Sequence, residues 1–164
     1  MSNIVIIVAM DNNNVIGISG KMPWRLSRDM GHFSEVTRRK TVIMGRKTYE
    51  SLSPKFRPLP KRENIILTRD PDFFAPGCTI VTSVEQVLMK SLEKEIWVIG
   101  GGEIYRLFLP HTKRMLVTHV DTCISGDTFF PEIEEGRWLS NQLFRHEADE
   151  KNQFSFSIVE YTKQ

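Results

Sequence analysis

Short apolar runs recur along the chain at a spacing that strongly limits its possible folds. The first run, Ile4 to Met10, is continuous and rich in β-branched residues, which is typical of a strand buried on both faces of a parallel sheet. It is far shorter than the roughly 20 apolar residues that cross a bilayer, so no membrane segment is expected. Further runs predict strands at 41–44, 64–68, 79–81, 95–99 and 115–120.

Helical patterns fill the intervals between these runs. Ser27 is expected to cap a helix that reaches about Arg38 and carries Met30 and Phe33 on one face. Further helices are expected at 47–52, 84–92 and 103–109, whereas residues 15–26 show no steady period and are expected to form a loop. Strands that alternate with helices pair in parallel through right-handed crossovers.

The alternation stops after Pro131, where 138–144 and 154–161 predict two strands with no helix between them. Such a pair forms an antiparallel hairpin, which we expect at an edge of the sheet. We therefore expect the 164 residues to form one α/β domain, 1–164. Its mostly parallel twisted sheet should carry helices on both faces and a C-terminal antiparallel hairpin.

Charge and cysteine content narrow the possible partners and location. The 22 Lys and Arg against 20 Asp and Glu give a net charge of +2. The pI is about 8.6, but the basic clusters at 38–40, 46–47, 57–62 and 113–114 are interpreted mostly as solvated faces. Cys78 and Cys123 lack metal or redox spacing, so free thiols and a reducing compartment are expected. The histidines form no ligand pattern, so no metal is expected. No cation precedes the first apolar run, which makes it a poor signal peptide, and a cytoplasmic location is expected.

Two junctions between a strand and a helix could hold a phosphate. Ile99 is followed by three glycines that open a helix, and Gly45 is followed by Arg46 and Lys47. Bare backbone at a helix N-terminus lets an anion approach the N–H groups. Each junction alone is equally compatible with a tight turn, but two in one sheet favour an extended anionic cofactor across the strand ends.

Three further places could carry chemistry, and each has an ordinary alternative. Asp29 lies in the first turn of its predicted helix, where the helix dipole favours a carboxylate with or without a pocket. Residues 57–62 combine prolines with three cations, which suit a carboxylate ligand or a solvated loop. Residues 126–131 could locally be any turn.

Taken in order, these segments resemble the dihydrofolate reductase family along nearly the whole chain. The matching positions are 15–17, 22–24, 29, 33, 43–48, 57–60, 62, 64–68, 99–102, 104–105, 118 and 126–131. None is specific alone, but the complete set is. The resemblance implies reduction of 7,8-dihydrofolate to tetrahydrofolate by NADPH, with hydride added to C6 and a proton to N5, supplying one-carbon metabolism. It also implies a monomer that binds antifolate inhibitors.

The resemblance implies a substrate site with two ends. Asp29 would be the pocket carboxylate that hydrogen-bonds the pterin, with help from Thr118 through water, and Trp24 would join them as a catalytic residue. Arg62 would grip the α-carboxylate of the glutamate tail. The implied pocket wall consists of Ile7, Val8, Met30, Phe33, Leu52, Leu59 and Ile99.

The implied NADPH cleft is larger. Its residues are Ala9, Ile16, Gly17, Met22, Gly45, Arg46, Lys47, Thr48, Thr68, Arg69, Ser83, Ile99, Gly101, Gly102, Glu103, Ile104, Tyr105 and Asp127. Among them, Arg46, Lys47 and Arg69 are expected near the 2′-phosphate, with Thr68 and Ser83 as hydroxyl donors. The bond between Gly100 and Gly101 matches a cis peptide of the family. Residues 15–26 resemble a mobile loop that closes over the nicotinamide and docks on the loop of Asp127.

Several positions depart from the family pattern. His32 stands where an aromatic or apolar residue is common in bacterial relatives, and Glu63 replaces a more usual basic residue beside Arg62. Residues 53–56 lengthen the stretch before Arg57, and Arg69 adds a cation. None of these changes removes a residue that the mechanism needs.

Two alternative functions remain open at this point. The pyrimidine reductase of riboflavin synthesis shares the fold but would lack the combination of Trp24, Asp29 and Arg62. A non-catalytic nucleotide-binding or nucleic-acid-binding module would suit the basic pI, although such modules interleave basic residues with an aromatic surface.

Overall fold

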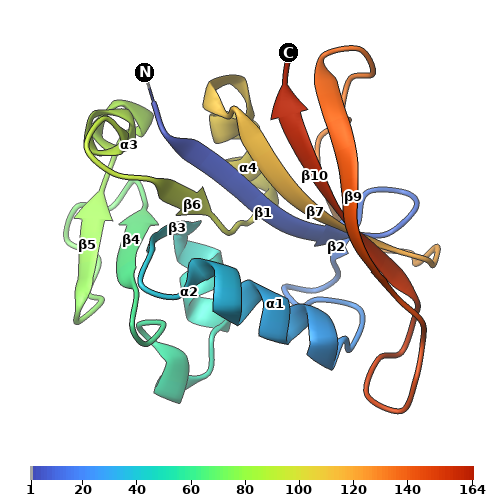
Figure 1. The fold of residues 1–164 in the computed structure, drawn as a ribbon. Helices are drawn as coiled ribbons and strands as arrows, with labels where there is room; N and C mark the ends of the chain where they lie inside the picture. The colour runs from blue at the N-terminus through green and yellow to red at the C-terminus, as the bar shows by residue number, and fades with distance from the viewer. Residues whose placement is uncertain (1) are drawn as a thin grey trace.

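Eight strands form one twisted sheet through the middle of the molecule (Figure 1). The computed structural model describes residues 2–164. The order across the sheet is β5-β4-β3-β6-β1-β7-β10-β9. The bounds are β1 Ile4–Met10, β3 Thr41–Gly45, β4 Glu63–Leu67, β5 Cys78–Val81, β6 Ile96–Val98, β7 Arg114–Val120, β9 Trp138–His146 and β10 Phe156–Lys163.

The six strands β5, β4, β3, β6, β1 and β7 pair with one another in parallel, whereas β10 is antiparallel to both β7 and β9. The chain thus ends in a hairpin whose outer strand, β9, forms one edge of the sheet. The predicted mostly parallel sheet and its C-terminal hairpin are confirmed.

Two pairs of helices cover the two faces of the sheet (Figure 1). They are α1 Ser27–Thr37, α2 Arg46–Ser51, α3 Val84–Ser91 and α4 Gly102–Phe108, with short 3-10 turns η1 Pro54–Phe56 and η2 Leu109–His111. Side chains of β1 alternate between the faces, as in any strand. Val5 and Ile7 pack with Phe33 of α1, whereas Ile4 and Ile6 pack with Phe108 of α4. Of the helices in residues 2–164, none has the length and apolarity that crossing a membrane requires.

Three local predictions are wrong, and in the first two distant contacts outweigh the local pattern. Residues 15–26 are not all loop, since Val15–Gly17 forms β2 and pairs antiparallel with β8, Thr128–Phe129. Ser27 does not cap α1, because Leu26 occupies the cap position and the Ser27 amide donates to the carbonyl of Lys151. The last strand begins at Phe156 and not at 154.

A buried aspartate fixes the end of β1 to this second, small sheet. Asp11 is only 2% exposed, and its carboxylate accepts the backbone N–H groups of Asn13, Val15 and Ile124 at 2.8, 2.9 and 2.8 Å. Such a carboxylate replaces the turn's missing backbone partners. Asp11 therefore joins β1, β2 and the loop before β8 at the edge where the site lies.

Candidate active site

The carboxyl ends of four central strands meet at one edge of the sheet. Parallel pairing places Ile6 opposite Val98 and Ala9 opposite Thr118. β6 lies between β3 and β1 although it follows both in the chain, so the order of the strands reverses there. In open α/β sheets, ligands bind in the crevice at such a reversal. The predicted site residues at the ends of β3, β6, β1 and β7 are therefore neighbours.

Asp29 lies in the first turn of α1, beside β7. The hydroxyl of Thr118 donates directly to Oδ1 of Asp29 over 2.6 Å, whereas the sequence predicted only a joint action through water. Burial raises the pKa of the Asp29 carboxyl group, and the Thr118 hydrogen bond and positive charge at His32 offset this rise only in part. A carboxyl group with a raised pKa at a strand edge is a candidate functional group.

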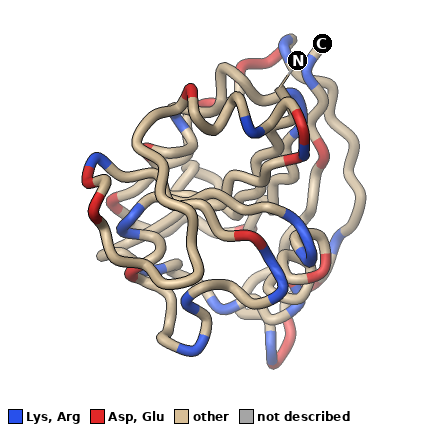
Figure 2. The backbone as a smooth tube through the Cα atoms, turned by 90° about the vertical axis from the view of Figure 1, so that its left-hand side faces the viewer, with Lys and Arg blue, Asp and Glu red and all other residues tan. Residues whose placement is uncertain are grey.

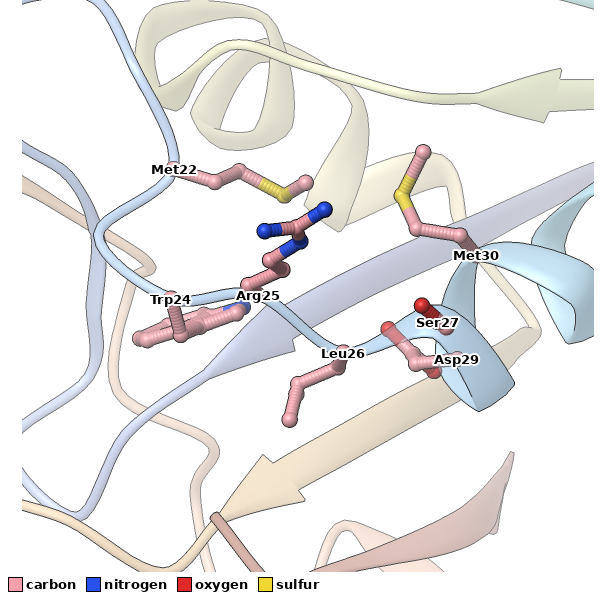
Figure 3. Close-up of a pocket in the computed structure, with 7 residues that line it drawn as sticks. All are labelled: Met22, Trp24, Arg25, Leu26, Ser27, Asp29 and Met30. Carbon is pink, nitrogen blue, oxygen red and sulfur yellow. The ribbon is translucent and has the colours of Figure 1, made fainter. Parts of the chain in front are cut away.

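A cavity of about 350 Å³ opens beside this carboxyl group (Figure 3). Trp24 and Leu26 on its wall are 7% and 3% exposed and pack in a cluster with Val120, Phe156 and Ile158. Figure 3 shows the side chains of Met22, Arg25 and Met30 on the same side of the segment. The full lining is Met22, Trp24, Arg25, Leu26, Ser27, Asp29 and Met30.

The remaining predicted wall residues, with one exception, form a single apolar cluster under α1 and α2. It contains Ile7 and Leu59, with Phe33, Leu52 and Ile99 packed against it. Val8 is the exception, because it packs in the cluster on the face of α3 and α4. Successive residues of a strand point to opposite faces, so the Val8 side chain lies apart from this cluster, and its part in the pocket wall stays a prediction.

Arg62 lies at the far end of α1 from the cavity. Phe33 is four residues after Asp29, about 6 Å along the helix axis, and the guanidinium carbon of Arg62 lies 5.9 Å from the centre of its ring. Nε of Arg62 is buried and has no hydrogen-bond partner among residues 2–164. Burial lowers the pKa of this guanidinium group. A half-buried cation with a buried, unused donor favours an anionic ligand.

The loop that carries Arg62 is held by Asn64, a residue to which the sequence assigned no role. Asn64 is 1% exposed. Its Nδ2 donates to the carbonyls of Leu59 and Arg62, both at 3.0 Å, and its Oδ1 accepts the amide of Leu59 at 2.9 Å. An asparagine followed by apolar strand residues is the only local sign of this arrangement.

The neighbouring cation, Arg57, serves the backbone. Its Nε donates to the carbonyl of Leu52 over 2.6 Å, and its Nη2 donates to the carbonyl of Glu50. Two of its donors are therefore used to close the turn after α2. The structure thus gives Arg57 a backbone role and leaves Arg62, the arginine that the family resemblance singled out, with a free donor.

Glycines line the junctions where backbone segments approach most closely. A Cβ at Gly45 would lie 3.0 Å from Cγ1 of Ile104, and one at Gly102 would lie 3.0 Å from Cγ2 of Thr128. The expected cis peptide is present between Gly100 and Gly101. The bare backbone that the sequence indicated therefore occurs at both junctions. They lie side by side, because β3 and β6 are paired in parallel.

Tyr105 fixes this region to β1. Its hydroxyl donates to the carbonyl of Ile7 over 2.8 Å, and burial raises the pKa of the Tyr105 hydroxyl far above its usual range. The side chain is therefore a neutral donor at any ordinary pH.

The polar residues predicted near the 2′-phosphate follow the ends of three neighbouring strands, β3, β4 and β5. Leu67 pairs with Gly45 and with Val81, so the residues that follow these three form one edge. The hydroxyl oxygens of Thr68 and Ser83 accept backbone amides at 3.2 and 3.3 Å, which leaves their O–H groups free to donate.

The cations at this edge differ in how strongly they are held. Arg46 lies 4.5 Å above the ring of Phe73 and forms ion pairs with Glu50 at 3.5 Å and with Asp70 at 4.0 Å. Arg69 is exposed and pairs with Glu103 at 3.7 Å. Arg46 is therefore the better ordered of the two. Lys47, the third predicted cation, is exposed.

The predicted docking partner of the 15–26 segment does contact it. Oδ2 of Asp127 accepts the amide of Ser19 at 2.8 Å, and the amide of Asp127 donates to the carbonyl of Gly17 at 3.1 Å. The Ser19 bond is the main reason why the pKa of Asp127 is lowered. A Cβ at Gly126 would lie 2.3 Å from Cγ1 of Val15, so only glycine permits this contact.

Comparison with known proteins gives consistent results. The family model described as dihydrofolate reductase matches residues 3–163. The dihydrofolate reductase of Bacillus subtilis is 39% identical, covering 96% of this chain and 92% of that protein, and that of Mycobacterium tuberculosis is 44% identical, covering 82% and 84%. A solved structure titled as dihydrofolate reductase from Enterococcus faecalis complexed with NADP(H) and RAB-propyl has a TM-score of 0.89 and 35% identity, covering 98% of this chain and 96% of that one.

Proposed function

The chain belongs to the dihydrofolate reductase family and reduces 7,8-dihydrofolate with NADPH, and we propose which of its side chains serve each part of that reaction. The observation that carries the assignment is the buried Asp29 carboxyl group, hydrogen-bonded to Thr118 at 2.6 Å beside a cavity at the strand ends. When bound, NADPH supplies the hydride that is added to C6 of the pterin.

Asp29 binds and polarises the pterin. Its ionised form favours a protonated, electron-poor ring, and the low-dielectric surroundings that raise its pKa also strengthen this attraction. Thr118 fixes the carboxyl group through Oδ1. Trp24, buried on the cavity wall, limits access of bulk water, and a single water molecule relays the proton to N5.

Arg62 binds the opposite end of the substrate. Its unpartnered Nε and planar fork suit the α-carboxylate of the glutamate tail. The apolar wall of Ile7, Phe33, Leu52, Leu59 and Ile99 lies between the two polar ends. Such a site fits an elongated ligand with one heterocyclic and one anionic end. Antifolates that have the same two ends fit it as well.

The glycine junctions bind NADPH. Gly45, Gly101 and Gly102 present bare backbone, and a Cβ at Gly101 would lie 3.4 Å from the hydroxyl of Thr48, so the cradle fits a pyrophosphate approaching the N-termini of α2 and α4. Arg46 and Arg69, with the hydroxyls of Thr68 and Ser83, hold the 2′-phosphate.

The remaining predicted residues complete this cleft. They are Ala9, Ile16, Gly17, Met22, Lys47, Ile99, Glu103, Ile104, Tyr105 and Asp127. A Cβ at Gly102 would lie 3.9 Å from Cδ1 of Ile16, so β2 lies beside the glycine junction. This supports a closed position of the 15–26 segment over the nicotinamide, held by Asp127.

We further propose a monomeric, cytoplasmic protein without a nucleic-acid partner. One chain supplies every element of the site. Cys78 and Cys123 are free thiols, as is usual in a reducing compartment. Figure 2 shows Lys and Arg interspersed with Asp and Glu along the chain, and several cations are paired, as Lys94 is with Glu63 at 2.6 Å.

The decisive experiment follows NADPH oxidation at 340 nm with purified protein and dihydrofolate. The wild type should turn over dihydrofolate, and Asp29→Asn should be nearly inactive at neutral pH. Turnover of a ribosylated diaminopyrimidine in place of dihydrofolate would instead favour a pyrimidine reductase. Salt-sensitive binding of random oligonucleotides without NADPH oxidation would favour a nucleic-acid module.

A further inference from the structure

The helix that carries Asp29 begins without a cap of its own. The cap position is occupied by Leu26, an apolar side chain that is 3% exposed and cannot accept a hydrogen bond. The first amides of a helix have no partners within the helix and need acceptors from elsewhere. Here a loop more than a hundred residues away supplies them, since the amide of Ser27 donates to the carbonyl of Lys151 at 3.1 Å.

Asn152 supplies the second acceptor with its side chain. Its Oδ1 accepts the amide of Arg28 at 2.9 Å, which is the contact that a helix's own cap residue normally makes. Asn152 is only 4% exposed. Its Nδ2 donates to Oδ1 of Asp149 at 2.8 Å, so the two ends of the amide have different partners and its orientation is fixed.

Asp149 is itself held on two further sides. Its Oδ2 lies 2.9 Å from Nε2 of His146, and its Oδ1 accepts the amide of Lys151 at 2.9 Å. A carboxylate only accepts, so Nε2 of His146 carries the hydrogen in this bond. These contacts, led by the one from Asn152, lower the pKa of Asp149 to about 2.

His146 also connects to the first turn of α1 through aromatic contacts. The ring of His146 stacks on that of Phe144, with centres 6.1 Å apart and planes 15° apart. The guanidinium carbon of Arg28 lies 4.9 Å from the centre of the same Phe144 ring. The start of α1 is thus attached to β9 and to the loop before β10 by backbone, amide and aromatic contacts.

We propose that Asn152 is a positioning residue for the reaction: by capping α1 from outside, it holds Asp29 against Thr118. This inference rests on the role of Asp29 proposed above. Asp29 follows the capped amide of Arg28 by one residue. Carboxylates in the first turn of a helix bind its free amides. Without the Asn152 oxygen, the Asp29 carboxylate turns toward the uncapped amides and leaves Thr118.

The test compares Asn152→Ala with Lys151→Ala, a matched control at an exposed neighbour. Lys151 gives α1 only its backbone carbonyl, which alanine keeps. Since a lost cap weakens a helix by roughly a factor of two to thirty, we expect Asn152→Ala to lower kcat/KM for dihydrofolate about five- to tenfold. The affinity for a small diaminopyrimidine, which pairs with Asp29, should fall equally, whereas the affinity for NADPH should not change.

A pH profile separates positioning from a merely structural effect. A carboxyl group that leaves the pocket regains water, so its pKa falls toward its ordinary value. The pH dependence of kcat/KM in Asn152→Ala should therefore move to lower pH. The double variant Asp149→Asn/Asn152→Asp keeps a cap oxygen and exchanges donor and acceptor, and it should recover part of the activity.

Separate outcomes test this inference and the proposed function. If Asn152→Ala lowers the melting temperature but matches Lys151→Ala in pH profile and diaminopyrimidine affinity, the positioning role is refuted. If Asn152→Ala does not fold, Asp149→Asn is tested in its place, because it weakens the bond that orients the Asn152 amide. It should lower kcat/KM and diaminopyrimidine affinity by about two- to threefold and shift the pH profile in the same direction. If Asp149→Asn matches Lys151→Ala in these measurements, the positioning role is refuted. Full activity of Asp29→Asn would instead refute the proposed function, whatever position 152 does.

Discussion

Replacing Arg62 by leucine should weaken substrate binding without slowing the chemical step. A charge-assisted hydrogen bond contributes roughly 1.5–3 kcal/mol. The buried, unpartnered Nε of Arg62 argues for the upper part of this range, and the partial exposure of the residue for the lower. We therefore expect a loss of about 2 kcal/mol, which corresponds to a rise in KM of about thirtyfold.

The turnover number should change little, because the tail carboxylate is the same in the ground state and the transition state. An interaction of equal strength in both states affects KM alone. Steady-state NADPH oxidation at varied dihydrofolate concentration measures both constants. Inhibitors that keep the glutamate should weaken as dihydrofolate does, whereas small diaminopyrimidines without a tail should bind Arg62→Leu as tightly as the wild type.

Arg57→Leu provides the matched control, since it removes another arginine from the same connection between α2 and β4. Arg57 donates to the carbonyls of Leu52 and Glu50, so its loss should lower the melting temperature and leave KM within about threefold, because surface charge effects are small. If Arg57→Leu raised KM and Arg62→Leu did not, the tail would be bound by Arg57. A parallel fall of kcat in Arg62→Leu would show that the arginine acts in the transition state.

Four further substitutions test the rest of the site. Asp29→Asn should lose most activity at pH 7 and partly regain it as the pH falls and solvent protonates the substrate. Because burial raises the pKa of Asp29, ionising it costs folding free energy above the ordinary pKa of aspartate, so the amide should also raise the melting temperature at pH 7; a lower one would contradict the burial argument. Positive charge at His32 lowers the pKa of Asp29, so His32→Phe should move the pH midpoint of kcat/KM upward, and an unchanged or lower midpoint would show that His32 does not act on Asp29. Arg46→Ala and Arg69→Ala should weaken NADPH more than NADH, by about tenfold for the better-ordered Arg46, as measured by fluorescence titration; equal losses for both cofactors would place the phosphate elsewhere.

Local sequence pattern was sufficient to predict the strands and helices of the parallel sheet. Continuous β-branched runs such as Ile4–Met10 are strands because only a sheet buried on both faces accommodates them, and their alternation with helices required parallel pairing. The glycine junctions after β3 and β6 could also be predicted locally, because each apolar run is followed directly by glycine and then by a helical pattern. The identity of the pocket residues followed from the order and spacing of many weak motifs together.

Features that depend on contacts between distant segments appear only in the folded chain. Three residues, Val15–Gly17, are too few to show a period, and they form β2 only because β8 pairs with them. Ser27 is of a residue type that often caps helices, yet Asn152 caps α1, because the helix starts where the distant loop supplies acceptors. The family resemblance singled out Arg62 for the ligand, but only the folded chain shows the physical difference between the two cations: Arg57 is bound to the Leu52 carbonyl, and Arg62 lies beside the Phe33 ring.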